Sequence, residues 1–121
     1  MRLLTTLCLV LLSVHSYSQE VFTGPFLIRD GITYHQDTNE PVTGIVEEFY
    51  DDGQLKGRGN FKDGKPDGLH EWFHDNGQLF SRGNFKDGKE DGLFENFDEN
   101  GTLVNTLTYR NGELVETNFN P

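Results

Sequence analysis

The stretch that decides the fold is Arg58-Gly59-Asn60-Phe61-Lys62-Asp63-Gly64-Lys65-Pro66-Asp67-Gly68-Leu69. It recurs 24 residues later, from Arg82 to Leu93, with eleven of its twelve positions identical. A fixed period of this length is typical of repeat architectures, in which each unit is one small supersecondary element stacked on the next. The chain is therefore predicted to be a repeat protein.

The composition narrows the fold class and the partners. The chain has 121 residues and a net charge of -10, from 20 acidic and 10 basic side chains. This balance argues against a nucleic-acid or anionic lipid surface, because both select for clustered Lys and Arg. The 14 glycines and 10 phenylalanines, together with the absence of alanine, favour short strands joined by tight turns over helices.

Residues 1–18 have the pattern of a secretory signal peptide. A basic start is followed by an apolar run at 3–14, and Ser16 and Ser18 precede a cleavage point before Gln19. The run is too short for a membrane span, which needs about 20 apolar residues. The sequence predicts export to the periplasm or the cell exterior, with no integral membrane span in the mature chain. The only cysteine, Cys8, lies within the run, so the mature chain is expected to have no disulfide and no lipid anchor.

The mature chain is predicted to be an all-β, single-layer antiparallel meander of stacked β-hairpins. Asn-Gly and Asp-Gly pairs between apolar runs are strong hairpin signals, and each 24-residue unit has two of them. Residues 19–43 form an N-terminal cap with a loose start at 19–24 and a hairpin around Asp30-Gly31. Three repeats follow at 44–67, 68–91 and 92–115. Residues 116–121 form a C-terminal cap, and 114–119 are expected to be a closing strand.

Alternation along the strands predicts two different faces. On one face we expect a regular ladder of Leu69, Leu93 and the phenylalanines Phe49, Phe73 and Phe97. We expect the strand glycines on that same face, with aromatic rings lying over them. The other face varies between units, as at Glu48, Trp72 and Asn96. It is either the surface that recognises a partner or ordinary solvent-facing surface.

These runs resemble the MORN repeat family in its bacterial variant. The resemblance rests on Phe49 to Leu55 followed by Gly59 to Gly68, and on the equivalent runs from Phe73 to Gly92 and from Phe97 to Gly112. The segment from Tyr34 to Gly44 is similar to the start of antitoxin-like MORN proteins named after YwqK. The resemblance implies a single-layer sheet and an interaction or scaffold role, with phospholipid binding in some eukaryotic members. The signal peptide does not suit a cytoplasmic antitoxin, and the acidic charge does not suit lipid binding.

No residue pattern predicts catalysis, a metal or a cofactor. His70 and His74 would share a strand face about 13 Å apart, too far to bind one zinc ion. Glutamates Glu47, Glu71 and Glu95 fall two strands apart, near 9.5 Å, and are expected to pair with basic residues or face water. The acidic turns lack the spacing of a calcium loop, although weak calcium binding stays open. The protein is predicted not to be an enzyme.

The leading functional hypothesis is therefore a protein–protein interaction or scaffold module with an unidentified protein partner. An antitoxin or immunity-like protein that binds a basic toxin is one alternative. A cell-wall or carbohydrate-binding module is another. The candidate partner-contact residues are the following aromatic side chains, most of which are equally well explained as core: Phe49, Trp72, Phe73, Phe80, Phe94 and Phe97.

Overall fold

The computed structural model describes residues 19–121, and the predicted signal peptide at 1–18 lies outside the described residues. The described residues form eleven strands and no helix. The strands are β1 (Val21–Phe22), β2 (Phe26–Arg29), β3 (Ile32–His35), β4 (Gly44–Phe49), β5 (Leu55–Lys62), β6 (Lys65–Phe73), β7 (Leu79–Lys86), β8 (Lys89–Glu90), β9 (Gly92–Phe97), β10 (Leu103–Arg110) and β11 (Glu113–Phe119).

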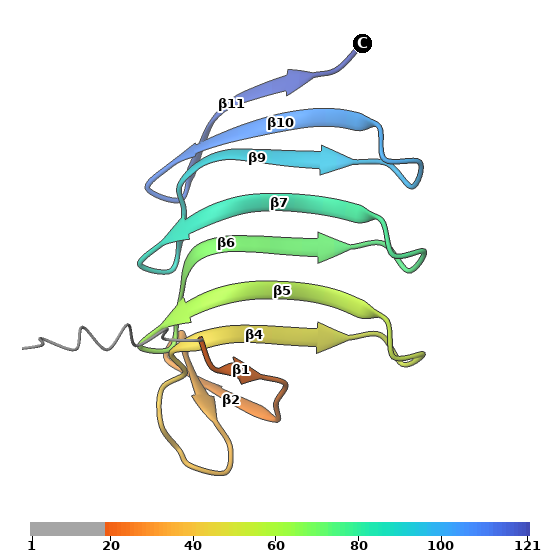
Figure 1. Ribbon diagram of the computed structural model, residues 1–121. Coiled ribbons are helices and arrows are strands. Elements are labelled where there is room, and N and C mark those ends of the chain that lie inside the picture. The colour runs from red at the N-terminus through yellow and green to blue at the C-terminus, as the bar shows by residue number, and fades with distance from the viewer. Residues whose placement is uncertain (1–18) are drawn as a thin grey trace, which may run out of the picture.

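Nine strands form one sheet in the order β1-β4-β5-β6-β7-β9-β10-β11, with the short β8 paired to β7. Strands β2 and β3 form a separate hairpin at its N-terminal end (Figure 1). From β4 to β11 each strand pairs antiparallel with its neighbour, so the single-layer meander is confirmed. The closing strand is also present, as β11.

The prediction that residues 19–24 are loose was wrong. Val21 and Phe22 pair in parallel with Ile45 and Val46 of β4, and the amide of Ile45 donates to the carbonyl oxygen of Glu20 at 2.8 Å. The pairing arises because β4 is the first strand of the repeat array and would otherwise expose its backbone groups. The segment therefore covers part of the N-terminal edge of the sheet.

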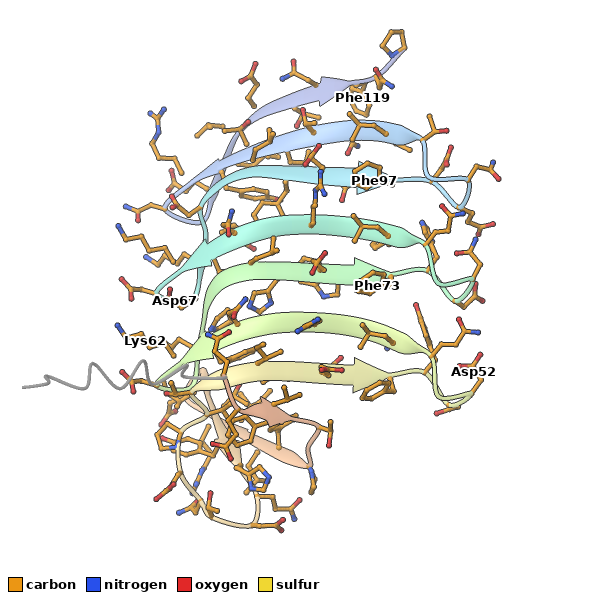
Figure 2. All side chains as sticks on the ribbon, in the orientation of Figure 1. Asp52, Lys62, Asp67, Phe73, Phe97 and Phe119 are labelled. Atoms are coloured by element: carbon orange, nitrogen blue, oxygen red, sulfur yellow. The ribbon has the colours of Figure 1, made fainter. Side chains whose placement is uncertain are left out.

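The two turns of each unit have different geometries, although both carry an Asx-Gly pair. At Asp63-Gly64 both residues have positive φ, 50° and 80°, which is the two-residue hairpin geometry that matches strand twist. At Asp52-Gly53 only the glycine does, with φ of 89°, and its amide donates to the carbonyl oxygen of Tyr50 at 2.9 Å. Figure 2 shows Asp52 and Lys62 at opposite rims of the sheet, one rim for each kind of turn.

The predicted assignment of residues to faces was wrong in one respect. Gly59 pairs with Val46 and His70, and Gly57 pairs with Glu48 and Trp72, so the strand glycines share a face with the varied residues. The leucine and phenylalanine ladder lies on the other face. We call the first the grooved face, and the second, which carries Leu69, Phe73 and their equivalents, the back face. A register shift in each first hairpin, as between Glu48 and Phe49, breaks the simple alternation on which the prediction depended.

The core lies on the grooved face. Val46 and Phe94 are 7% and 6% exposed, and the polar His70 and Ser81 are buried beside them. Hydrogen bonds join each unit to the next at both rims. The amides of Gly64, Gly88 and Gly112 donate to the carbonyl oxygens of Val42, Pro66 and Glu90 at 2.8, 2.8 and 3.0 Å. The varied residues and the turns thus form the framework that holds the units in register.

Candidate functional site

The grooved face is built from glycines that lie directly beneath aromatic rings. A Cβ atom added to Gly59 would overlap the ring of His70, and one added to Gly83 would overlap the ring of Phe94. At Gly57 the added atom would lie 3.3 Å from Cδ1 of Trp72. Each glycine therefore lets a ring from the neighbouring strand lie against the backbone. The prediction that rings cover the glycines is confirmed, but the rings come from the varied residues.

The rings form a continuous row across the units. Ring centroids are 5.4 Å apart for Phe61 and His70, 4.6 Å for His70 and Phe85, and 5.5 Å for Phe85 and Phe94. The row ends at Tyr109, 5.1 Å from Phe94. Tilted and edge-on rings at these separations are favourable beyond the area they bury. The row is the main source of packing between the units.

Trp72 stands between two hollows on this face. Its indole lies 5.8 Å from the ring of His70 and 6.2 Å from that of Phe85. One hollow, of about 220 Å³, extends from Trp72 towards Glu48 over Gly57 and Gly59. The other, of about 330 Å³, extends towards Phe80, Asn96 and Tyr109. Gly57 and Gly59 contribute no side chains to the first hollow, and the second hollow lies on the other side of the same partly exposed tryptophan.

His70 is buried within the row, and its burial favours the neutral form of the imidazole. Burial lowers its pKa from the ordinary 6.5, and the hydrogen bond of Nε2 with the carbonyl oxygen of Asn60, at 2.9 Å, opposes that shift only in part. The neutral ring donates from Nε2, which satisfies a backbone carbonyl inside the sheet. The position makes His70 a structural residue of the core.

The groups that could carry chemistry are spread apart. His74 binds the carbonyl oxygen of Phe97 at 3.0 Å through Nε2, so the two histidines have separate backbone partners. Arg82 pairs with Glu95 at 2.9 Å, as expected for the repeated glutamates. Among residues 19–121, no group of three or more His, Cys, Asp or Glu side chains is placed to hold a metal ion.

A sequence model for the family described as MORN repeat variant matches residues 42–63, 66–87 and 90–111. Together the three segments make up more than half of the chain. The chain belongs to the MORN repeat family. In this MORN protein the matched segments correspond to the hairpin pairs β4–β5, β6–β7 and β9–β10. Membership supports a repeat-based interaction module.

A search of curated proteins finds no match to this MORN chain. Among solved structures, the crystal structure of TarM aligns with a TM-score of 0.36 and 16% sequence identity. The alignment covers 73% of this chain and 21% of the TarM chain, and a likeness this low carries no argument about fold or function. Within residues 19–121, the structure contains no helix that is long and apolar enough to cross a membrane.

The six candidate contact residues of the MORN sheet divide between its faces. Trp72 and Phe80 border the hollows, and Phe80 is 48% exposed. Phe94 lies in the ring row and is 6% exposed, which favours its alternative role in the core, although it also borders the second hollow. The other three, Phe49, Phe73 and Phe97, lie on the back face, and Figure 2 shows the latter two at the ends of β6 and β9.

Sequence reasoning missed the second hollow and its lining residues Phe85 and Tyr109 as part of a site. The signal that could have found them is the register of the glycines. Once Gly83 is paired with His70, alternation along β7 places Phe85 on the same face. The Phe94 ring lies beside Gly83, and the Tyr109 ring is 5.1 Å from Phe94. The register depends on bulges that the sequence pattern does not reveal.

Proposed function

We propose that this MORN chain is an exported, non-enzymatic protein–protein interaction or scaffold module whose grooved face receives the partner. The observation that carries the proposal is the position of Trp72, partly exposed between two hollows, the first of which has a floor of Gly57 and Gly59. Tryptophan is enriched among the residues that dominate binding energy, particularly where a pocket surrounds it. Export is supported by the signal-peptide pattern at residues 1–18.

The charge of the groove indicates the kind of protein segment that would fit. Glu48 lines the first hollow, whose lining also includes Arg58, and Glu90 lines the second without a basic residue. The whole chain has a net charge of -10, so its field attracts basic partners. We infer that the partner presents a basic segment with an apolar side chain that packs against Trp72.

Removal of the indole tests the proposal. The protein is tethered and exposed to an envelope extract of its own host, and captured proteins are compared between the native chain and Trp72→Ala. We expect Trp72→Ala to lose the captured partner, by at least about tenfold in affinity. Leu93→Ala is the matched control, because Leu93 is 53% exposed but lies on the back face. If Trp72→Ala folds and captures the partner as well as the control does, the proposal fails.

An antitoxin or immunity role is the second candidate, and it is favoured by the acidic charge. Electrostatic attraction speeds association with a basic toxin and makes it sensitive to salt. Co-expression with a toxin-like product of a neighbouring gene tests this role. Protection of the cells would support it, and unchanged killing would reject it for that toxin.

A cell-wall or carbohydrate-binding role is the third candidate, and it is favoured by the aromatic lining of the hollows. Sugar rings pack on indole faces through apolar contact, so binding should persist at high salt. Sedimentation with insoluble peptidoglycan tests it. Salt-insensitive binding that disappears in Trp72→Ala would support this role over a basic protein partner, whose binding should weaken as salt rises.

A further inference from the structure

The back face carries a row of charges that alternates in sign from strand to strand. Glu47 lies opposite Arg58, Arg58 opposite Glu71, Glu71 opposite Arg82, and Arg82 opposite Glu95. Residues directly opposite in a ladder share a face, and neighbouring strands lie about 4.8 Å apart. The five side chains therefore form a straight row across β4 to β9, with evenly spaced negative and positive groups.

Apolar side chains flank this row on both sides. Towards one rim are Leu69 and Leu93, which are 41% and 53% exposed. Towards the other rim are three cross-strand pairs of phenylalanine with leucine, Phe49–Leu55, Phe73–Leu79 and Phe97–Leu103. Phe49 is 46% exposed, although phenylalanine is a residue that folding usually buries. No second layer covers this face within residues 19–121.

Most of the charges in the row are not used within the chain. Arg82 pairs with Glu95 at 2.9 Å, and its guanidinium lies 5.7 Å from the centre of the Phe97 ring. In the described part of the chain, Glu47, Arg58 and Glu71 form no ion pair within 4.0 Å. These three lie in the part of the row nearest β4, where their charges are available to a partner.

We propose that two copies of this chain associate through their back faces, about a two-fold axis that runs parallel to the strands between β5 and β6. In the second copy, this axis leaves the strands running in the same direction as in the first copy. The order of the strands across the sheet is reversed. The row is then reversed and displaced by one strand, so opposite charges meet at the four positions from β4 to β7, while Glu95 extends beyond the overlap. Arg58 of each copy then faces Glu71 of the other, and Glu47 faces Arg82.

The same axis places apolar rows against apolar rows. Two sheets pack face to face about 10 Å apart with their strands roughly aligned, as in a β-sandwich. Four strands of about six residues, with two residues each of β1 and β9, give roughly 450 Å² per copy, or about 900 Å² in total, which is the size of a weak, transient interface. The self-complementary charge row is what favours a second copy over an unrelated protein as the occupant.

One electrostatic effect opposes this dimer. The hairpins after β4, β6 and β9 contain Asp51, Asp52, Asp75, Asp98 and Glu99, and the two-fold axis places these acidic rims side by side. Each copy also has a net charge of -10. Salt screens this longer-range repulsion, since the Debye length falls from about 10 Å at 0.1 M to about 3 Å at 1 M. The dimer should therefore become more populated as the salt concentration rises.

Charge reversal with mixing tests the proposal. By sedimentation velocity, we expect the native chain to shift towards dimer as NaCl is raised from about 0.1 M to 0.5 M. Arg58→Glu and Glu71→Arg should each weaken self-association by at least about tenfold, because each places like charges opposite each other twice. An equimolar mixture of the two variants should recover the dimer. In the mixed dimer, the glutamate introduced at position 58 of one chain faces the arginine introduced at position 71 of the other. The native Glu71 of the first chain faces the native Arg58 of the second.

Two variants control for net charge. Lys56→Glu and Glu48→Arg change the net charge by the same amounts. Glu48 lies on the grooved face and Lys56 is at the position equivalent to Phe80, which borders that face, so dimerisation should change less than threefold. Circular dichroism establishes that each variant is folded. The proposal is overturned if the native chain stays monomeric at both salt concentrations. It is also overturned if folded Arg58→Glu and Glu71→Arg dimerise normally, or if their mixture fails to associate. The grooved-face test with Trp72→Ala is independent of every one of these results.

Discussion

Glycines that lie beneath aromatic rings determine how closely the side chains of one strand pack against the backbone of the next. Gly59 and Gly83 have ordinary extended backbone, so their identity is required by the space that His70 and Phe94 occupy. At Gly57 the neighbouring indole is 3.3 Å from the place of a Cβ atom, which a small shift can accommodate. The same residue type therefore has different importance at positions that look alike in the sequence.

Gly83→Ala should destabilise the protein more than Gly57→Ala. The added methyl group at position 83 overlaps the Phe94 ring, and overpacking of this kind costs roughly 1–3 kcal/mol. At position 57 we expect less than about 1 kcal/mol, because the indole can move slightly outward. Urea denaturation of both variants measures the difference. Equal stabilities would contradict the packing described for the ring row.

His70 should make the stability of the protein depend on pH. Burial lowers its pKa in the folded state below the ordinary 6.5, so the unfolded chain binds a proton at higher pH than the folded chain does. Stability is then greatest above 6.5 and decreases as the pH falls through 6.5 towards the lowered folded-state pKa.

His70→Phe is the matched variant, because Phe94 occupies the equivalent position in the next unit. Between pH 7.5 and 5 the free energy of unfolding should fall more steeply in the native chain than in His70→Phe. The carboxylates contribute equally to both proteins, so the comparison isolates the histidine. Parallel pH profiles would show that the burial of His70 has no effect on its protonation.

Two hairpin turns with the same sequence have different surroundings in the fold. The turns Asp63-Gly64 and Asp87-Gly88 both have positive φ at both residues, with 80° and 84° at the glycines. A Cβ atom at Gly64 would lie 2.8 Å from the carbonyl oxygen of Thr33 and would overlap Ile32, because the N-terminal hairpin β2–β3 packs there. At Gly88 the nearest atoms are methylene carbons of Lys65 at 3.8 Å.

Gly64→Ala should therefore cost more stability than Gly88→Ala. Both variants pay about 1–2 kcal/mol for a left-handed conformation at a residue with a side chain. Only Gly64→Ala also displaces the β2–β3 hairpin, which should add roughly 1–3 kcal/mol. Hydrogen exchange should show faster amide exchange at Thr33 and Val42 in this variant alone. Protection that is retained there would mean that the hairpin does not depend on the turn.

The sequence predicts the elements of this fold better than their faces. The Asx-Gly turns, the hairpin at Asp30-Gly31 and the closing strand all follow from local chemistry that the structure confirms. Two features could not be predicted. Val21 and Phe22 are too few to show a pattern, and their parallel partner β4 lies more than twenty residues away. The bulges at Lys56, Phe80 and Val104 reset the alternation along the second strand of each hairpin, so the glycines were assigned to the wrong face.

At the scale of the whole molecule, one sheet has two surfaces with different roles. The grooved face holds the core and also exposes Trp72 and Phe80, so packing and the proposed recognition share it. The candidate site was predicted only in part. Trp72 and Phe80 were named from their aromatic type, whereas the hollows depend on long-range register. The back face exposes a regular ladder because a single layer has nothing to bury it against.

The measurement that tests the central proposal most directly is site-specific photo-crosslinking from the grooved face. A photoreactive phenylalanine analogue is placed at position 80 beside Trp72, and in a separate variant at position 115 on β11, which is also exposed. After illumination in an envelope extract of the host, we expect one discrete protein adduct from position 80 and none from position 115. When Trp72→Ala is introduced into the position-80 variant, we expect that adduct to disappear, because the partner should no longer bind beside position 80. Adducts from position 115 alone would contradict the assignment of recognition to the grooved face.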